Sequence, residues 1–99
     1  MNNTKTVAKL ELNKSKLGKM NSWERFQVYS NFCHDEFGIM RWCGLTKAEE
    51  IQLILEGGWE DRIIEKGPTS ITFAVDEWWL DMIKNTKYDL NLLDKYLSY

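Results

Sequence analysis

The chain has 99 residues, of which 43% are hydrophobic and 28% are charged, which is the size and composition of one folded domain over residues 1–99. Thirteen basic and fifteen acidic side chains give a formal net charge of −2, which disfavours a general binder of nucleic acid or of anionic membranes. No apolar run approaches the ~20 residues that cross a bilayer. Two cysteines are too few for a secreted disulfide scaffold. We therefore expect a cytoplasmic protein with no membrane segment.

The amino-terminal segment is basic and alternates in polarity. Residues 1–20 carry five lysines against Glu11 alone, while Ala8, Leu10 and Leu12 alternate with polar neighbours. This alternation predicts a strand over about residues 7–12 with one buried face. Residues 1–6 and 13–20, on either side of the strand, are expected to be flexible. A mobile basic arm that contacts phosphates is the alternative interpretation, and the sequence leaves it open.

The first predicted helix spans residues 22–37. Its apolar residues recur at steps of three and four, as on one face of a helix, at Phe26, Tyr29, Cys33 and Phe37. Asn21 or Ser22 is placed to cap the helix, and Gly38 is placed to end it. We expect this apolar face, with Trp23 near its start, to lie in the core.

A second helix is predicted over residues 47–56. Thr46 and Glu49 have the spacing of a capping box, in which each side chain accepts a hydrogen bond from the backbone N–H of the other residue. The apolar face of this helix consists of Ala48, Ile51, Ile54 and Leu55. Glu49, Glu50 and Glu56 point elsewhere, so the solvent face of the helix is expected to be acidic.

A β-hairpin is predicted after this helix. Its strands span about residues 61–65 and 70–75, and the turn between them holds the single proline of the chain, Pro68. The second strand alternates, with Ile71, Phe73 and Val75 expected on the buried face.

Two more helices complete the predicted fold. Asp76 is placed to cap a helix over residues 77–84. Thr86 is placed to cap one over residues 87–97, whose core residues would be Leu90, Leu93 and Leu97. The predicted fold is therefore α+β, with a small antiparallel sheet of two or three strands packed with three or four helices.

Residues with metal-binding or nucleophilic chemistry are few. Cys33, His34 and Cys43 are candidate zinc ligands, but a structural zinc site needs paired cysteines two to four residues apart, and Cys33 fits the apolar face of its helix. Neighbouring carboxylates such as Glu49 and Glu50 are better explained by helix capping and solvation than by acid–base chemistry. We expect no metal, no cofactor and no catalysis. A metal-dependent enzyme remains an alternative that metal analysis of the purified protein would reveal.

The order helix, helix, hairpin over residues 21–75 resembles that of winged-helix DNA-binding domains. The resemblance implies that the second helix enters the major groove, in a regulator that also uses the basic amino-terminal segment. Residues 46–67 oppose this hypothesis, because three basic side chains face six acidic ones there, a net charge of −3. A nucleic-acid-binding regulator is therefore the alternative function.

Tryptophan is the most informative part of the composition. Five tryptophans, four tyrosines and four phenylalanines exceed what one small core holds, so we expect at least one indole in a partner interface. Rigid aromatic rings beside charged groups are typical of interface hot spots. The residues expected to bind the partner are Trp42, Glu49, Glu50, Trp59, Glu60, Asp61 and Trp78.

The expected function is binding without catalysis to a larger protein. A compact acidic domain can inhibit a nucleic-acid-handling protein by placing carboxylates where that protein expects phosphates. Ten lysines and seven asparagines against three alanines suit an AT-rich genome, such as that of a phage or mobile element that acts against host or defence proteins. A homodimer is left open, because a second copy can also cover an aromatic patch.

Overall fold

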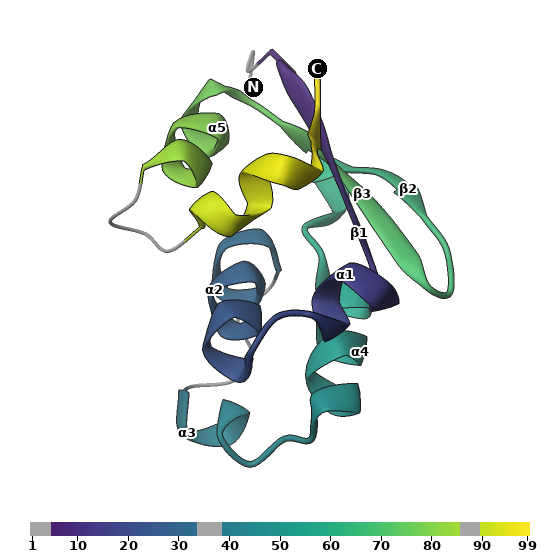
Figure 1. Ribbon diagram of the computed structural model, residues 1–99. Coiled ribbons are helices and arrows are strands. Elements are labelled where there is room, and N and C mark those ends of the chain that lie inside the picture. Colours follow the sequence, from purple (N-terminus) through teal and green to yellow (C-terminus); the bar gives the residue numbers. More distant parts are fainter. Residues whose placement is uncertain (1–4, 34–38, 86–89) are drawn as a thin grey trace.

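The sheet of this protein is antiparallel throughout. The computed structural model describes residues 5–33, 39–85 and 90–99 (Figure 1). In these ranges four strands pair in the order β2-β3-β1-β4. They are β1 (Ala8–Asn13), β2 (Ile63–Lys66), β3 (Ser70–Val75) and β4 (Leu97–Ser98). The α+β class is confirmed, but the sheet has one strand more than the upper number expected.

β1 lies inside the sheet because both of its edges are paired. It runs antiparallel to β3, with Ala8 opposite Val75 and Leu12 opposite Ile71. On its other edge Leu10 pairs with Leu97 of β4. The predicted alternation holds, since the side chains of Ala8, Leu10 and Leu12 are buried and Glu11 between them is exposed. The strand interpretation of the amino-terminal segment is therefore confirmed for these residues.

The described residues form five α-helices, one more than the upper number expected, and two short 3-10 helices. The α-helices are α1 (Lys14–Gly18), α2 (Ser22–Phe32), α3 (Ile39–Trp42), α4 (Lys47–Gly57) and α5 (Glu77–Lys84). The 3-10 helices are η1 (Glu60–Arg62) and η3 (Asn91–Tyr96).

Side-chain caps explain where four of these helices begin. Asn13 caps α1 by accepting a hydrogen bond from the backbone N–H of Lys16 over 2.8 Å. Asn21 and Glu24 form a capping box at α2, and Thr46 and Glu49 form the predicted one at α4. Asp76 caps α5 by accepting a hydrogen bond from the backbone N–H of Trp79. The caps at Thr46 and Asp76 were placed correctly from the sequence, and Asn21 is one of the two residues expected to cap α2.

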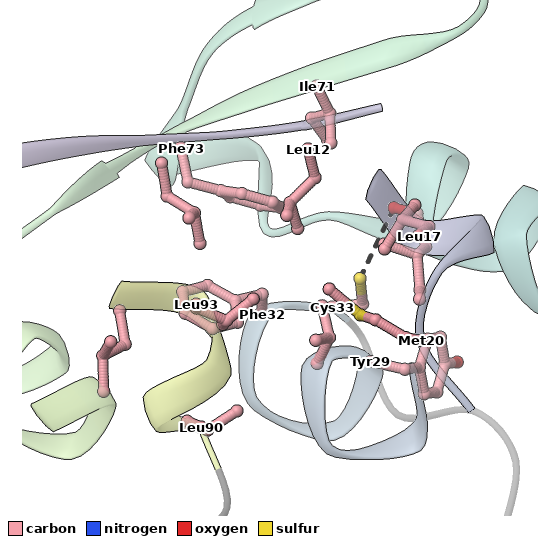
Figure 2. Packing of buried hydrophobic residues seen from close by; sticks show 14 of the residues in the cluster. Leu12, Leu17, Met20, Tyr29, Phe32, Cys33, Ile71, Phe73, Leu90 and Leu93 are labelled. Atoms are coloured by element: carbon pink, nitrogen blue, oxygen red, sulfur yellow. Dashed lines mark hydrogen bonds between the residues drawn. The ribbon is translucent and has the colours of Figure 1, made fainter. Parts of the chain in front are cut away.

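The core lies between the inner face of the sheet and the helices. Figure 2 shows Leu12 and Phe73 of the sheet above Phe32 of α2 and Leu93 of η3. The ring centroids of Phe32 and Phe73 are 5.3 Å apart, and those of Phe32 and Trp79 are 4.4 Å apart. These rings pack α2 and α5 against the same part of the sheet, since Trp79 belongs to α5.

A buried ion pair joins α2 to α4. Nε of Arg25 lies 2.7 Å from Oε1 of Glu50, and both side chains are almost fully buried. Arg25 also donates to the backbone oxygens of Leu17 and Met20, which come just before α2. The Ser22 hydroxyl donates to Oε2 of Glu50 over 2.6 Å. Because every group in this network has partners, the two charges can stay in the interior.

Four segments differ from the sequence predictions. The first strand of the hairpin, expected over about residues 61–65, is β2 at Ile63–Lys66, because Glu60–Arg62 form the 3-10 helix η1. The helix expected over 22–37 ends at Phe32, and Cys33 is extended and bridges Gly58, whereas Phe37 and Gly38 lie outside the described residues. Of the helix expected over 87–97, the described part forms η3 and the start of β4, whereas residues 86–89, Thr86 included, lie outside the described residues. Residues 14–18, which belong to a segment expected to be flexible, form α1 with Leu17 buried.

None of the helices in the described ranges has both the length and the apolar character that crossing a membrane requires.

Candidate functional site

The segment that leaves α4 places Trp59 at the surface. Gly58 is buried, and the backbone N–H of Trp59 donates to the carbonyl of Phe32 over 3.1 Å, which fixes this segment to the end of α2. The carbonyl of Trp59 accepts from the backbone N–H of Arg62 over 2.9 Å, which forms the turn of η1. The indole of Trp59 is 38% exposed. Hydrogen bonds through its own N–H and carbonyl therefore hold the backbone of Trp59 in a defined place, with its ring partly exposed.

Arg62 links this turn to the start of α5. Its Nη1 donates to Oδ2 of Asp76, and its guanidinium lies 4.8 Å from the ring centroid of Trp79. The other carboxylate oxygen of Asp76 accepts from the N–H of Trp79 over 2.9 Å. One carboxylate thus caps α5 and binds η1 at the same time.

The surroundings of Asp76 favour its charged form. Burial raises the pKa of this carboxyl, but the hydrogen bond from Arg62, the backbone N–H groups of Trp79 and Trp78 and the charge of Arg62 together lower it. The net result is a pKa below the usual value of 3.8. The ion pair between η1 and α5 is therefore present at neutral pH.

Trp78 follows Asp76 by two residues and faces solvent. Its side chain is 66% exposed, whereas neighbouring Trp79 is buried, as expected for adjacent positions about 100° apart on a helix. Glu77 and Asp81 are exposed on the same helix, and Glu60 and Asp61 are exposed on η1. We call these exposed residues of η1 and α5, with the half-exposed ring before η1, the tryptophan–acid surface, which consists of Trp59, Glu60, Asp61, Glu77, Trp78 and Asp81.

The charge of this region is strongly negative. Residues 59–62 and 76–81 contain five acidic side chains and one arginine, a net charge of −4. The arginine is Arg62, whose guanidinium is already bonded to Asp76. Trp59 and Trp78, three residues before Arg62 and two after Asp76 in sequence, therefore flank this ion pair in an acidic environment.

Four of the seven predicted site residues belong to this surface, and three lie elsewhere. Trp42 is only 2% exposed, and its Nε1 donates to the Ser22 carbonyl over 3.1 Å. Glu50 is buried in the ion pair with Arg25. Glu49 is exposed, but it belongs to the capping box at the start of α4. The structure therefore places Trp42 and Glu50 where neither reaches a partner.

Trp23 corrects the expectation that it lies in the core, since 51% of its side chain is exposed. Its ring stacks on Phe26 with centroids 5.7 Å apart, and Phe26 in turn contacts buried Trp42. Trp23 is the second residue of α2, whereas Trp59 is bonded to Phe32, the last residue of that helix. The two residues thus lie near opposite ends of α2, and the helix rises about 13 Å from Trp23 to Phe32.

The two cysteines lie in different environments. Cys33 is buried, with its Sγ 3.6 Å from the carbonyl oxygen of Ile54, and burial raises the pKa of its thiol to about 12 (Figure 2). Cys43 is exposed, and His34 lies outside the described residues. In the ranges that are described, no three histidine, cysteine or carboxylate side chains come together in a way that could hold a metal ion.

An apolar hollow that the sequence did not indicate lies between α3 and α4. Its volume is about 240 Å³, and it is lined by Arg41, Leu45, Glu49, Gln52 and Leu53. Glu49 is the residue that it shares with the predicted site. Its walls come from a helix of four residues, the connection after it and the first turns of α4, so no sequence motif marks it.

Comparisons with models of protein families, with curated protein sequences and with solved structures find nothing that matches this chain.

Proposed function

We propose that this chain is a non-catalytic module that binds a larger protein in the cytoplasm through the tryptophan–acid surface. The observation that carries the proposal is the 66% exposure of Trp78 at the start of a helix whose first turn is fixed by Asp76 and Arg62. A rigid indole held outward loses little conformational entropy on binding and buries a large apolar area. Such a ring is suited to anchor an interface.

The charge of the surface defines the partner that fits it. A net charge of −4 over residues 59–62 and 76–81 attracts a basic protein surface and repels nucleic acid. Basic surfaces that also carry apolar or aromatic side chains are typical of proteins that bind nucleic acids. The proposed partner is therefore a nucleic-acid-handling protein of a host or its defence system, and this chain acts as its competitive inhibitor, encoded by a phage or mobile element.

The test is capture from a host lysate on the immobilised protein, followed by elution with duplex DNA. The variants are Trp78→Ala and the double charge reversal Glu60→Lys with Asp61→Lys. Trp23→Ala is the matched control, because it removes an exposed indole near the other end of α2. The proposal expects a partner that wild type and Trp23→Ala retain, that the other two variants lose and that duplex DNA displaces. Equal retention by all four proteins would rule out this surface.

Lysines near α1 favour a second candidate function, a regulator that binds nucleic acid. Lys47 of α4 lies over Gly18, since its Cε is 3.7 Å from the position a Cβ of Gly18 would occupy, and Lys14 and Lys19 are exposed nearby in sequence. Lys16 is held by Glu11, whose backbone oxygen accepts from its Nζ over 2.9 Å. Binding of the chain itself to duplex DNA, weakening steeply as salt rises, would support this candidate over the first.

A further inference from the structure

The protein contains an internal example of arginine recognition beside its proposed docking surface. The guanidinium of Arg62 lies 4.8 Å from the centroid of the Trp79 ring and donates to the carboxylate of Asp76. An indole face and a carboxylate together satisfy the two preferences of a guanidinium, which stacks on aromatic rings and bonds to paired oxygens.

The neighbouring residues of α5 offer the same two groups to the outside. Trp78 is exposed, and Asp81 follows it by three positions, which places their side chains on one helical face. Glu77 and Asp81 are exposed and four positions apart, so they are also neighbours on the helix surface. The first two turns of α5 therefore present an indole with the carboxylate of Asp81 beside it, and Glu77 next to Asp81 on its other side.

Resting on the proposed function, we propose that this part of the tryptophan–acid surface binds an arginine side chain of the partner in preference to lysine. The guanidinium lies on the face of Trp78 and donates to Asp81, three positions away, as Arg62 does with Trp79 and Asp76.

Arginine is favoured over lysine for two physical reasons. The planar guanidinium is more weakly hydrated than an ammonium group, so less hydration is lost when it stacks on the indole. It also donates two parallel hydrogen bonds to one carboxylate, whereas lysine acts as a point charge. Coulomb attraction alone would bind arginine and lysine equally well. A preference for arginine over lysine therefore indicates stacking on the ring and not charge neutralisation alone.

The experiment uses the full chain and two peptides of equal length and charge, one alternating arginine with glycine and one alternating lysine with glycine. Affinity is measured by isothermal titration calorimetry, and the binding position by the indole N–H signals in NMR spectra. Wild type is expected to bind the arginine peptide roughly threefold to tenfold more tightly. Trp78→Leu is expected to bind both peptides equally, and Trp23→Leu, the matched control, to keep the preference.

The outcomes separate the inference from the function on which it rests. Equal affinity of wild type for both peptides overturns arginine selectivity and leaves a general docking surface for basic proteins. A preference that survives in Trp78→Leu also overturns it, because another ring then carries the selectivity. If neither peptide binds wild type at low salt, the inference and the proposed function both fail.

Discussion

Arg25 and Glu50 form an ion pair inside the protein, with Nε and Oε1 2.7 Å apart, although they are 25 residues apart in sequence. Ser22 and the carbonyls of Leu17 and Met20 complete the hydrogen bonds of the two groups. This network ties α2 to α4 and to the segment that precedes α2.

Removal of one member of this pair is expected to be severely destabilising. Glu50→Ala leaves the guanidinium of Arg25 buried without its counter-charge, which costs about 3–5 kcal/mol of unfolding free energy. Glu56→Ala, on the exposed side of the same helix, is the control and is expected to change the unfolding free energy by less than about 0.5 kcal/mol. Urea denaturation measures both values. Equal effects of the two variants would contradict a structural role for the ion pair.

Substitution by alanine is expected to affect the unfolding free energy differently at the two adjacent glycines at the end of α4. A Cβ at Gly58 would lie 2.8 Å from Cδ1 of Ile71 and 2.9 Å from Cε1 of Phe73, so core side chains must shift. Gly58→Ala is therefore expected to lower the unfolding free energy by about 1–3 kcal/mol. A Cβ at Gly57 has its nearest neighbours at 3.6 Å, which is ordinary contact. Gly57→Ala is expected to be neutral or to stabilise the helix by up to about 1 kcal/mol.

Thermal or urea unfolding of the two alanine variants tests this prediction. The contrast between neighbouring positions is the result that matters, because both variants make the same chemical change. A Gly58→Ala protein as stable as Gly57→Ala would show that Ile71 and Phe73 adapt without loss.

Asp76 makes stability depend on pH in acid solution. Its pKa in the folded protein is below the value of 3.8 expected for the unfolded chain, so its ionisation stabilises the fold. This contribution is complete above the unfolded pKa and is lost as the pH falls through the lower folded pKa. Asp76→Asn, which keeps an N-cap side chain but no charge, is expected to be less stable at neutral pH by about 1 kcal/mol.

The measurement is the unfolding free energy of wild type and Asp76→Asn from neutral pH to below pH 4. The difference in unfolding free energy between the two proteins is expected to shrink at the acid end. There Asp76 of the wild type becomes protonated and loses its charge, whereas the asparagine of the variant has no charge to lose. Parallel curves over the whole range would argue against ionisation of Asp76 as a source of stability.

The two thiols are expected to react at very different rates. Cys43 is exposed, whereas Cys33 is buried with its pKa raised to about 12. Since the thiolate is the reactive form, iodoacetamide at neutral pH should label Cys43 alone in the folded protein. Peptide mass spectrometry identifies the labelled residue, and labelling in denaturant provides the control in which both react. Rapid labelling of Cys33 without denaturant would mean that its burial is incomplete.

The parts of the fold predicted correctly are those that local signals determine. Alternation over Ala8–Asn13 and capping residues such as Thr46 act over a few neighbouring positions, so they can be read without knowledge of the packing. α1 and α3 were missed because helices of four or five residues are too short to show a periodic pattern.

The carboxyl-terminal segment was assigned the wrong type of helix. Leu90 and Leu93 are both buried, as predicted, but a spacing of three also fits the three residues per turn of a 3-10 helix. Leu97, expected on the same helix face, instead pairs with Leu10 in the sheet. That pairing joins residues far apart in sequence, and no local pattern indicates it.

The exposure of the residues expected at the candidate site was predicted only in part, for a related reason. Trp59, Glu60, Asp61 and Trp78 were correctly placed outside the core, because they flank charged turns and helix starts. Glu50 was placed on the solvent face because its buried partner, Arg25, belongs to another helix. For Trp23 and Trp42 the predicted burial was the reverse of the observed one. Trp42 packs in the interior beside Tyr29, and Trp23 is exposed. Which of two indoles is buried is decided by the packing of α2 against α3.

The central place of β1 in the sheet has a consequence for how the chain matures on the ribosome. β1 precedes both of its neighbours in sequence, which are β3, with Ala8 opposite Val75, and β4, with Leu10 opposite Leu97. One hydrogen-bonding edge of β1 therefore stays open until residues 70–75 are translated, and the other until residues 97–98 are translated. The pair of α2 and α4 needs a shorter stretch of chain, because it forms within residues 22–57. α2 and α4 can pair on the emerging polypeptide, whereas the sheet closes later, so the apolar face of β1 is uncovered until β3 is made.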